Sequence, residues 1–257
     1  MNIQFNLGTK LPEKDTPLIF FMFTGEDIAK SQLYKFMEEE EKAYIKGIHD
    51  ATKLKNKEQK VFIMPKTERK VLLVGLGKAK DFNIQKAALA TRMAVISAKK
   101  ERIKKFAFYS APMKSAKETV KFFEAVSSSA EMANFEFNKY KSPPEEGFAY
   151  VEEITAIALK KDKNIAEGIR RGKLIGEEVN ACRELANTPG GDMTPKVLAD
   201  HAINDAKGTK IKIRILEEDK ISELGMGGVI GVSKGSNEGP RFIIMEYFAG
   251  RKTEKPI

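Results

Sequence analysis

Residues 71–109, VLLVGLGKAKDFNIQKAALATRMAVISAKKERIKKFAFY, decide the fold of this chain. The apolar run Val71–Leu76 predicts a short strand, and Ile84–Lys99 predicts a helix for which Asn83 is a plausible N-cap. The run Phe106–Tyr109 predicts a second strand. A strand, a helix and a strand of these lengths form a βαβ unit, which indicates a largely parallel sheet with helices on its faces.

The flanking sequence extends the same alternation. Ile19–Phe23 is continuously apolar, as a strand buried on both faces should be. Ile28–Ile48 carries a rough apolar stripe and predicts one long helix, with Glu38–Glu41 on its solvated face. The remaining elements expected up to residue 160 are a strand at Val61–Met64, a helix at Ser115–Met132 and a strand at Glu153–Leu159.

Two segments mark candidate boundaries. Lys139–Gly147 (KYKSPPEEG) is a linker or long loop, because Pro143 and Pro144 cannot continue a helix. The charged run Lys160–Lys163 precedes a new long helix, so we divide the chain into domains 1–160 and 161–257. Asn164 and Glu167 fit a capping box for this helix. Its glycines share one face, which predicts a close neighbour there: Gly168, Gly172 and Gly176.

Beyond this helix the pattern remains α/β. Thr194 is placed to cap a helix that begins at Pro195 and ends near Ala206. The elements expected after it are a strand at Ile211–Leu216, a short helix at Glu217–Leu224, a buried strand at Gly228–Val232 and a strand at Arg241–Tyr247.

Composition excludes several classes of protein. The 257 residues are 42% hydrophobic, which is enough for a sizeable core. The one cysteine, Cys182, cannot form an internal disulfide, and with two histidines it cannot build a usual Cys/His zinc site. Any metal would depend on carboxylates. Without a membrane-length apolar run or a signal-peptide pattern at the N-terminus, we expect a soluble, cytoplasmic protein.

The net charge of +9 comes from one segment. Residues 51–105 hold 16 Lys and Arg against 4 Asp and Glu, whereas the rest of the chain is slightly acidic. Such a patch can attract nucleic acid or acidic ligands, and it can equally be a solvated surface. The lysines at 53, 55, 57 and 60 have no interleaved aromatic residues on which bases could stack.

No group of residues forms a strong catalytic pattern by spacing alone. Gly75 and Gly77 follow a strand, but Lys80 stands where a dinucleotide fingerprint needs its third glycine, so a turn is the better interpretation. Gly231–Gly239 (GVSKGSNEG) could cradle an anion, although a flexible strand-to-strand loop fits better. The other candidates are two isolated histidines, His49 and His201, an inert buried thiol at Cys182, and a carboxylate late in a strand, Glu246.

The second half also resembles a known family. The segments that carry the resemblance follow one another in order: Asn180–Pro195 (NACRELANTPGGDMTP), Glu223–Gly231 (ELGMGGVIG), Ser233–Ser236 (SKGS) and Pro240–Tyr247 (PRFIIMEY). Together they resemble the entry into the catalytic domain of the leucyl (cytosol) aminopeptidases. Val71–Gly77 and Phe135–Ser142 resemble segments of that family's N-terminal domain. One departure is Gly191, where the family often has Asn.

This resemblance implies a macro-like N-terminal domain with a mixed, mostly parallel sheet, followed by a truncated α/β catalytic domain. It also implies a hexamer that removes N-terminal residues from peptides with two divalent metal ions, Mn²⁺ or Zn²⁺. The family's metal-binding and catalytic motifs would follow residue 257. We therefore assign no catalytic, cofactor-binding or metal-binding residue, and we expect the chain alone to be inactive.

Two alternatives remain open. The chain could be a non-catalytic module that binds nucleic acid through the basic segment 51–105, for which binding should weaken steeply with salt. It could also be an assembly module that joins complete subunits in a hexamer.

Overall fold

The computed structural model describes residues 2–10, 13, 16–35, 37–52, 59–63, 69–109, 115–158 and 160–248. The chain forms two compact units, which we call unit 1 (Met1–Ala181) and unit 2 (Cys182–Ile257). Each unit has its own sheet. None of the helices in the described ranges is long and apolar enough to cross a bilayer.

Unit 1 is built on a six-stranded sheet with the order β1-β6-β5-β2-β4-β3. All neighbouring strands in it run parallel except the edge pair β3 and β4. This confirms the predicted α/β class with a mixed, mostly parallel sheet. The strands are β1 Gln4–Gly8, β2 Leu18–Phe23, β3 Gln59–Ile63, β4 Lys70–Gly77, β5 Lys105–Tyr109 and β6 Glu153–Ile157. The edge strand β1 was not among the predicted elements.

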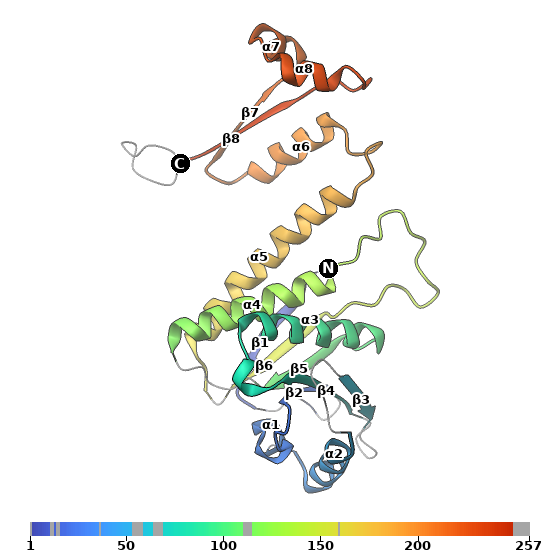
Figure 1. Cartoon of the computed structure of the whole chain (residues 1–257), viewed down its shortest axis with the longest axis vertical. Coiled ribbons are helices and arrows are strands. Elements are labelled where there is room, and N and C mark those ends of the chain that lie inside the picture. Colours follow the sequence, from blue (N-terminus) through green and yellow to red (C-terminus); the bar gives the residue numbers. More distant parts are fainter. Residues whose placement is uncertain are drawn as a thin grey trace. The chain divides into compact units, whose positions relative to one another are not determined.

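Helices cover both faces of this sheet (Figure 1). Helices α3 (Ile84–Lys100) and α4 (Ala116–Asn134) lie on one face. The other face carries the 3₁₀ turn η1 (Ile28–Lys30), α1 (Gln32–Lys35) and α2 (Glu39–Thr52). Both helix pairs are needed because β2 is apolar on both sides: Ile19 packs into the first core and Leu18 and Phe20 into the second.

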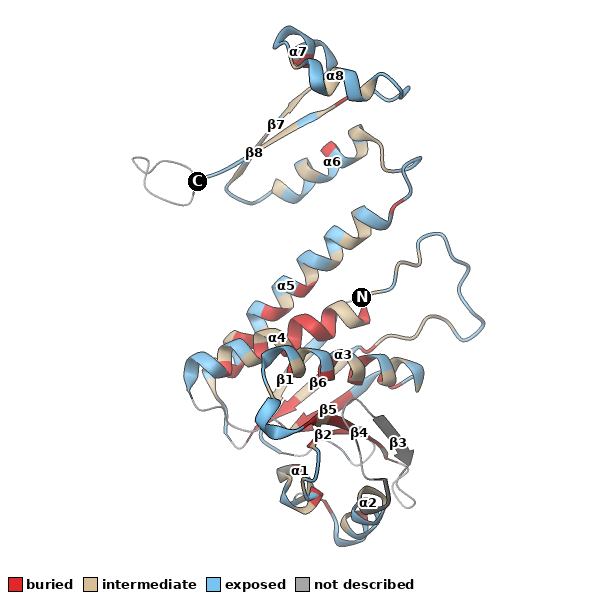
Figure 2. Cartoon of the chain, in the orientation of Figure 1, coloured by how far each residue is buried: buried red, intermediate tan, exposed pale blue. Residues whose placement is uncertain are grey.

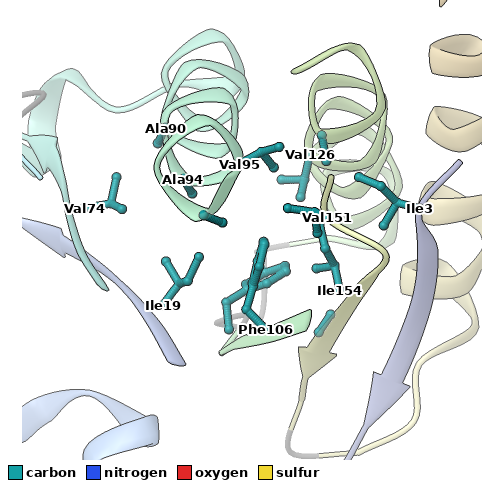
Figure 3. Close-up of a cluster of buried hydrophobic side chains, with 14 of the residues drawn as sticks. Ile3, Ile19, Val74, Ala90, Ala94, Val95, Phe106, Val126, Val151 and Ile154 are labelled. Carbon is teal, nitrogen blue, oxygen red and sulfur yellow. The ribbon is translucent and has the colours of Figure 1, made fainter. Parts of the chain in front are cut away.

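The core between the sheet and α3 contains many small residues. Small residues of α3, such as Ala90 and Ala94, let that helix approach Phe106 and Ile154 of the sheet (Figure 3). The buried surfaces run along the sheet and the inward sides of its helices (Figure 2). The predicted N-cap of α3 is confirmed, since the Asn83 side chain accepts a hydrogen bond from the backbone N–H of Lys86.

The predicted single helix at Ile28–Ile48 is wrong. The chain forms η1 and α1 and then starts again as α2. The Glu41 carboxylate accepts a hydrogen bond from the backbone N–H of Glu38 at 3.4 Å, which caps the start of α2. The interpretation of Glu38–Glu41 as a solvated face also fails at one position, because Glu41 is buried and lies 4.0 Å from Arg69.

Helix α5 (Lys163–Asn187) begins one residue before the predicted cap. Asp162, and not Asn164, is its capping side chain, since the Asp162 carboxylate accepts the backbone N–H of Asn164 at 2.8 Å. Glu167 does not reach back to the cap; it binds Arg170 and Arg171 instead. A capping box needs both partners at the helix start, and Asp162 already occupies that place.

The predicted close approach along the glycine face of α5 is confirmed. A Cβ atom on Gly168 would lie 2.6 Å from the Val120 carbonyl oxygen, and one on Gly176 would lie 2.5 Å from the Glu131 Cβ. Both partners belong to α4. The two helices therefore pack with their backbones in near contact, which side chains at the glycine positions would prevent.

Residues 135–152 contain the predicted long loop. No helix or strand interrupts it between α4 and β6. The buried Asn134 side chain ties its far end down by donating to the Val151 carbonyl and accepting the Val151 N–H, both at 2.8 Å. The loop thus returns to the sheet at a fixed point.

Unit 2 contains α6 (Pro195–Ala206), β7 (Ile211–Leu216), α7 (Glu218–Glu223), α8 (Gly227–Ser233) and β8 (Phe242–Tyr247). The predicted cap of α6 is confirmed, as Thr194 accepts the N–H of Val197 and Pro195 opens the helix. Strands β7 and β8 match the predicted strands and pair antiparallel.

The predicted buried strand at Gly228–Val232 is wrong, because these residues form α8 and Val232 is 88% exposed. A short apolar run has no periodicity that separates a strand from a helix. Here the backbone N–H of Ile230 donates to the Met226 carbonyl at 3.3 Å, as in a helical turn.

Compactness divides the chain after Ala181, within α5. The domain boundary that the sequence predicts, between residues 160 and 161, lies just before the start of α5. It stays a prediction.

Candidate functional site

A cavity of unit 1 lies at the carboxyl ends of its parallel strands. It has a volume of about 330 Å³ and is lined by the ends of β2, β4 and β5, among them Phe23, Leu76 and Tyr109. Helix residues complete it from both layers, with Leu33 from α1 and Phe122 from α4. It therefore lies at the strand ends, where residues of both cores, such as Ile19 and Leu33, line it.

The topology of the sheet explains why a cavity forms here. Strands β2 and β5 are parallel neighbours. The chain leaves β2 toward α1 and α2 on one face, and it leaves β5 toward α4 on the other. Connections that depart in opposite directions from adjacent strands leave a crevice at their carboxyl ends, which is where ligands bind in open α/β sheets.

Aromatic rings form the walls of the cavity. Phe21 and Phe108 meet edge to face with centroids 5.7 Å apart, and Phe23 meets Phe82 in the same way at 5.2 Å. These contacts fix the rings without a ligand. Ala87 and Ala90 of α3 leave space beside them because their side chains are small. The cavity is thus a preformed apolar slot.

A few polar groups line the same slot. The polar residues among its lining are Glu26, Lys30, Ser31, Thr91 and Tyr109. Glu26 Oε2 accepts the backbone N–H of Phe23 at 2.8 Å, which holds the carboxylate in place. Burial raises the pKa of the Tyr109 hydroxyl, so this group stays protonated at neutral pH.

Two glycines, Gly75 and Gly77, lie in the last three residues of β4 beside this cavity. Gly77 has a φ of 81°, a left-handed conformation that favours glycine. Its carbonyl accepts the backbone N–H of Thr24 at 2.9 Å. The chain then enters the 3₁₀ turn η2 (Ala79–Asp81), which contains Lys80, before α3 starts. Gly75 and Gly77 therefore belong to β4, paired with Met22 and Phe23 of β2. The prediction that they form a turn after the strand is wrong, and neither glycine opens a helix.

The other sequence candidates do not converge. His49 lies on α2 in unit 1, whereas His201 lies on α6 in unit 2. Glu246 is exposed on β8 opposite Lys212. The prediction of a buried thiol at Cys182 is wrong, because this residue is exposed on α5. The prediction rested on its place inside a long helix, but none of residues 181–187 of α5 is buried.

The glycine-rich segment Gly231–Gly239 also differs from its prediction. It begins inside α8 and leads into β8, so it connects a helix with a strand and not two strands. Beyond the end of α8, Gly235 has no atoms near the position of a Cβ, and Gly239 lies near Arg241.

The basic segment 51–105 is only partly within the described residues, and the side chains of Lys53, Lys55, Lys57 and Lys60 lie outside them. Several of its other cations are paired with carboxylates. Lys104 binds Glu152 at 2.9 Å, Arg102 binds Glu146 at 2.6 Å, and Lys99 binds Glu136. These partners come from outside the segment and reduce its local surplus of positive charge.

A dinuclear metal site needs several carboxylates or histidines in one place. Within the described ranges, no group of three or more His, Cys, Asp and Glu side chains is arranged to hold a metal ion. The residues present thus do not fit such a site, and we assign no metal ligand among them.

Two family models match the chain in order. The N-terminal domain of the cytosol aminopeptidase family matches residues 19–144, and the catalytic domain of the same family matches residues 180–257. A probable cytosol aminopeptidase of Bdellovibrio bacteriovorus is 29% identical over 98% of this chain and 52% of its own length. The chain thus spans about half the length of this curated relative.

Solved structures share the fold. A mutant of tomato leucine aminopeptidase matches 99% of this chain and 53% of its own chain with a TM-score of 0.80 at 21% identity. The bottromycin maturation enzyme BotP in complex with Mn matches 91% of this chain and 45% of its own, with a TM-score of 0.67 at 19% identity.

Proposed function

The chain belongs to the cytosol aminopeptidase family, and from this premise we propose that it serves in the metal-dependent removal of N-terminal residues from peptides. In this proposal it supplies the N-terminal domain and the first part of the catalytic domain. The ordered match of both domains of one family carries the proposal. The substrate would be a peptide with a free amino terminus.

Two divalent metal ions, Mn²⁺ or Zn²⁺, would supply the chemistry, since metal ions activate water and polarise the scissile carbonyl. Members of the family are metal-dependent, and BotP has been solved with Mn. The described residues of this chain do not provide the ligands. We propose that the ligands belong to the part of the relatives' length that this chain does not match.

The exposed apolar side chains of unit 2 agree with this division. Met245 is 54% exposed and Tyr247 64% exposed on β8, and Leu224 after α7 is 54% exposed. Among the described strands β8 pairs only with β7. An apolar surface of this kind is usually covered by another element. Further strands and helices of the catalytic domain are the covering elements we propose.

The domain arrangement, assembly and location complete the proposal. Residues 1–160 would form a macro-like N-terminal domain and residues 161–257 the first part of the catalytic domain. The parallel sheet of unit 1 with helices on both faces supports the first assignment. We further propose a hexamer, which the family resemblance implies, and a cytoplasmic location, which the cytosol aminopeptidase name of the relatives suggests.

The test is release of leucine from leucyl amide with added Mn²⁺ or Zn²⁺. We expect the protein isolated from its native source to be active and to have an intact mass well above 28.7 kDa. We expect the purified 257-residue chain to release no leucine under the same conditions. Metal-dependent activity of the 257-residue chain would overturn the assignment of the ligands to other residues.

A non-catalytic role through the basic segment 51–105 is the second candidate, favoured by its 16 cations against 4 anions. It would bind nucleic acid through phosphate contacts, so affinity should fall steeply as salt rises. The ion pairs of Lys99, Arg102 and Lys104 argue for weak binding. Absence of binding at low salt would end this candidate, and subunit assembly would be the remaining non-catalytic role.

A further inference from the structure

We propose that the cavity at the carboxyl ends of β2, β4 and β5 binds a free amino acid with an apolar side chain. The pairing of one carboxylate and one ammonium group with an aromatic slot points to this ligand class. The link between this ligand and the peptidase reaction rests on the proposed function, because apolar amino acids are products of that reaction.

The volume of the cavity limits the size of the ligand. A volume of about 330 Å³ is at the lower end of the range for small-molecule sites, which run from about 300 to 1,000 Å³. It suits a compact molecule and is too small for an extended peptide or a long acyl chain. The position at the switch between β2 and β5 gives it the usual place of a ligand site in an α/β sheet.

The aromatic walls of the cavity limit the polarity of the ligand's side chain. Phe21, Phe23, Phe82 and Phe108 present ring faces and edges that are already packed in pairs. A branched aliphatic or aromatic side chain would bury its surface against them, and a charged side chain would be desolvated there. The slot therefore selects an apolar body.

The polar residues of the cavity determine which charged groups the ligand should carry. Lys30 forms no ion pair among the described residues, and its ammonium group is available for a carboxylate. Glu26 uses Oε2 for the Phe23 N–H, and Oε1 accepts no hydrogen bond from the described residues. A ligand with one carboxylate and one ammonium group matches this pair, and charge-assisted hydrogen bonds are the strong ones.

Phosphorylated ligands fit less well. A phosphate group calls for several cations or a row of backbone N–H groups at a helix N-terminus. Lys30 is the one cation that lines the described cavity, and the turn at Gly77 leads into η2 and not directly into α3. The carboxylate of Glu26 would also repel a phosphate.

The experiment is calorimetric titration of the 257-residue chain with L-phenylalanine and L-leucine. Phenethylamine, which lacks the carboxylate, and 3-phenylpropionate, which lacks the ammonium group, are the ligand controls. We expect saturable binding of both amino acids and at least tenfold weaker binding of both controls, since each loses one charge-assisted contact.

Variants locate the site. Lys30→Gln and Glu26→Gln should each weaken binding of L-phenylalanine about tenfold or more. In Glu26→Gln the amide oxygen can still accept the Phe23 N–H, so the loop keeps its shape. Ala87→Leu should abolish binding by filling the slot. The matched control is Lys46→Gln, which removes an exposed cation of α2 outside the cavity.

Absence of binding would overturn the proposal, as would 3-phenylpropionate binding as tightly as L-phenylalanine or unchanged affinity in Lys30→Gln. The result is independent of peptidase activity. Amino-acid binding without peptidase activity in the native protein would support the cavity site and contradict the proposed function. Peptidase activity without amino-acid binding would support the proposed function and contradict the cavity site.

Discussion

Gly172 of α5 lies so close to Glu124 of α4 that a Cβ atom on Gly172 would be 2.1 Å from the Glu124 carbonyl oxygen. It would also lie 2.2 Å from the Ser127 Oγ. That hydroxyl bonds to the carbonyls of Phe123 at 2.6 Å and Ile169 at 3.2 Å, and so joins the two helices. The backbone of α5 at Gly172 is thus in close contact with the backbone of α4.

Gly172→Ala should lower the free energy of unfolding by about 3 kcal/mol or more, because the new methyl group would meet backbone that cannot turn aside. The matched control is Gly47→Ala in α2, where nothing lies within 4 Å of the added Cβ. This control should stabilise by up to about 1 kcal/mol through helix propensity. Urea unfolding measures both, and equal effects would contradict the packing described.

Glu131 makes the stability of unit 1 depend on pH. Its side chain is 1% exposed; Oε1 accepts the Ile3 N–H at 2.9 Å, and Oε2 has no partner within the described residues. Burial raises the pKa of this carboxyl to about 7, and Glu177 raises it further against the opposing effects of the Ile3 hydrogen bond and Lys173. Between pH 4.5 and about 7 the folded chain therefore holds more protons than the unfolded chain.

The free energy of unfolding should fall as pH rises through this window, by on the order of 3 kcal/mol in total. Glu131→Gln should remove this part of the pH dependence, since an amide does not titrate. Denaturant unfolding at pH 5 and pH 8 measures it, with exposed Glu178→Gln on α5 as the control. An unchanged slope in Glu131→Gln would show that another group titrates.

Asn134→Ala should destabilise unit 1 by about 2–4 kcal/mol, because it leaves the buried N–H and C=O of Val151 without their partner. The control is Asn138→Ala, which removes a part-buried hydrogen bond to the Tyr150 hydroxyl and should cost about 1 kcal/mol or less. Thermal unfolding of the two variants compares them. A larger loss in Asn138→Ala would contradict the role of Asn134 in holding the loop.

Cys182 should react with an aromatic disulfide reagent in the native chain at a rate close to that of a free thiol, because it is exposed. Absorbance of the released thiolate measures the reaction. Reaction only after addition of denaturant would mean that the thiol is covered in the folded protein.

Local signals predicted elements in both units. Asn83, Thr194 and the continuous apolar run of β2 each act within a few residues, so the sequence alone indicates the elements they begin or form. The glycine spacing of α5 likewise predicted a close helix contact, although the sequence could not name α4 as the partner.

The sequence-based predictions were wrong where contacts with residues distant in the sequence, or the absence of a clear periodicity, left the local structure undetermined. Glu41 is buried beside Arg69, which comes directly before β4, so the break before α2 was not visible in the apolar stripe. The short run at 228–232 had no period to read. The cavity was missed because its rings, among them Phe21, Phe82 and Phe108, come from separate elements and meet only in the folded sheet.

The most direct test of the proposed function is the rate of leucine release from leucyl amide by the protein purified from its native source, before and after a chelator. We expect activity with Mn²⁺ or Zn²⁺ that the chelator removes and that restored metal recovers. Absence of leucine release with either metal, at any concentration that keeps the protein folded, would contradict it.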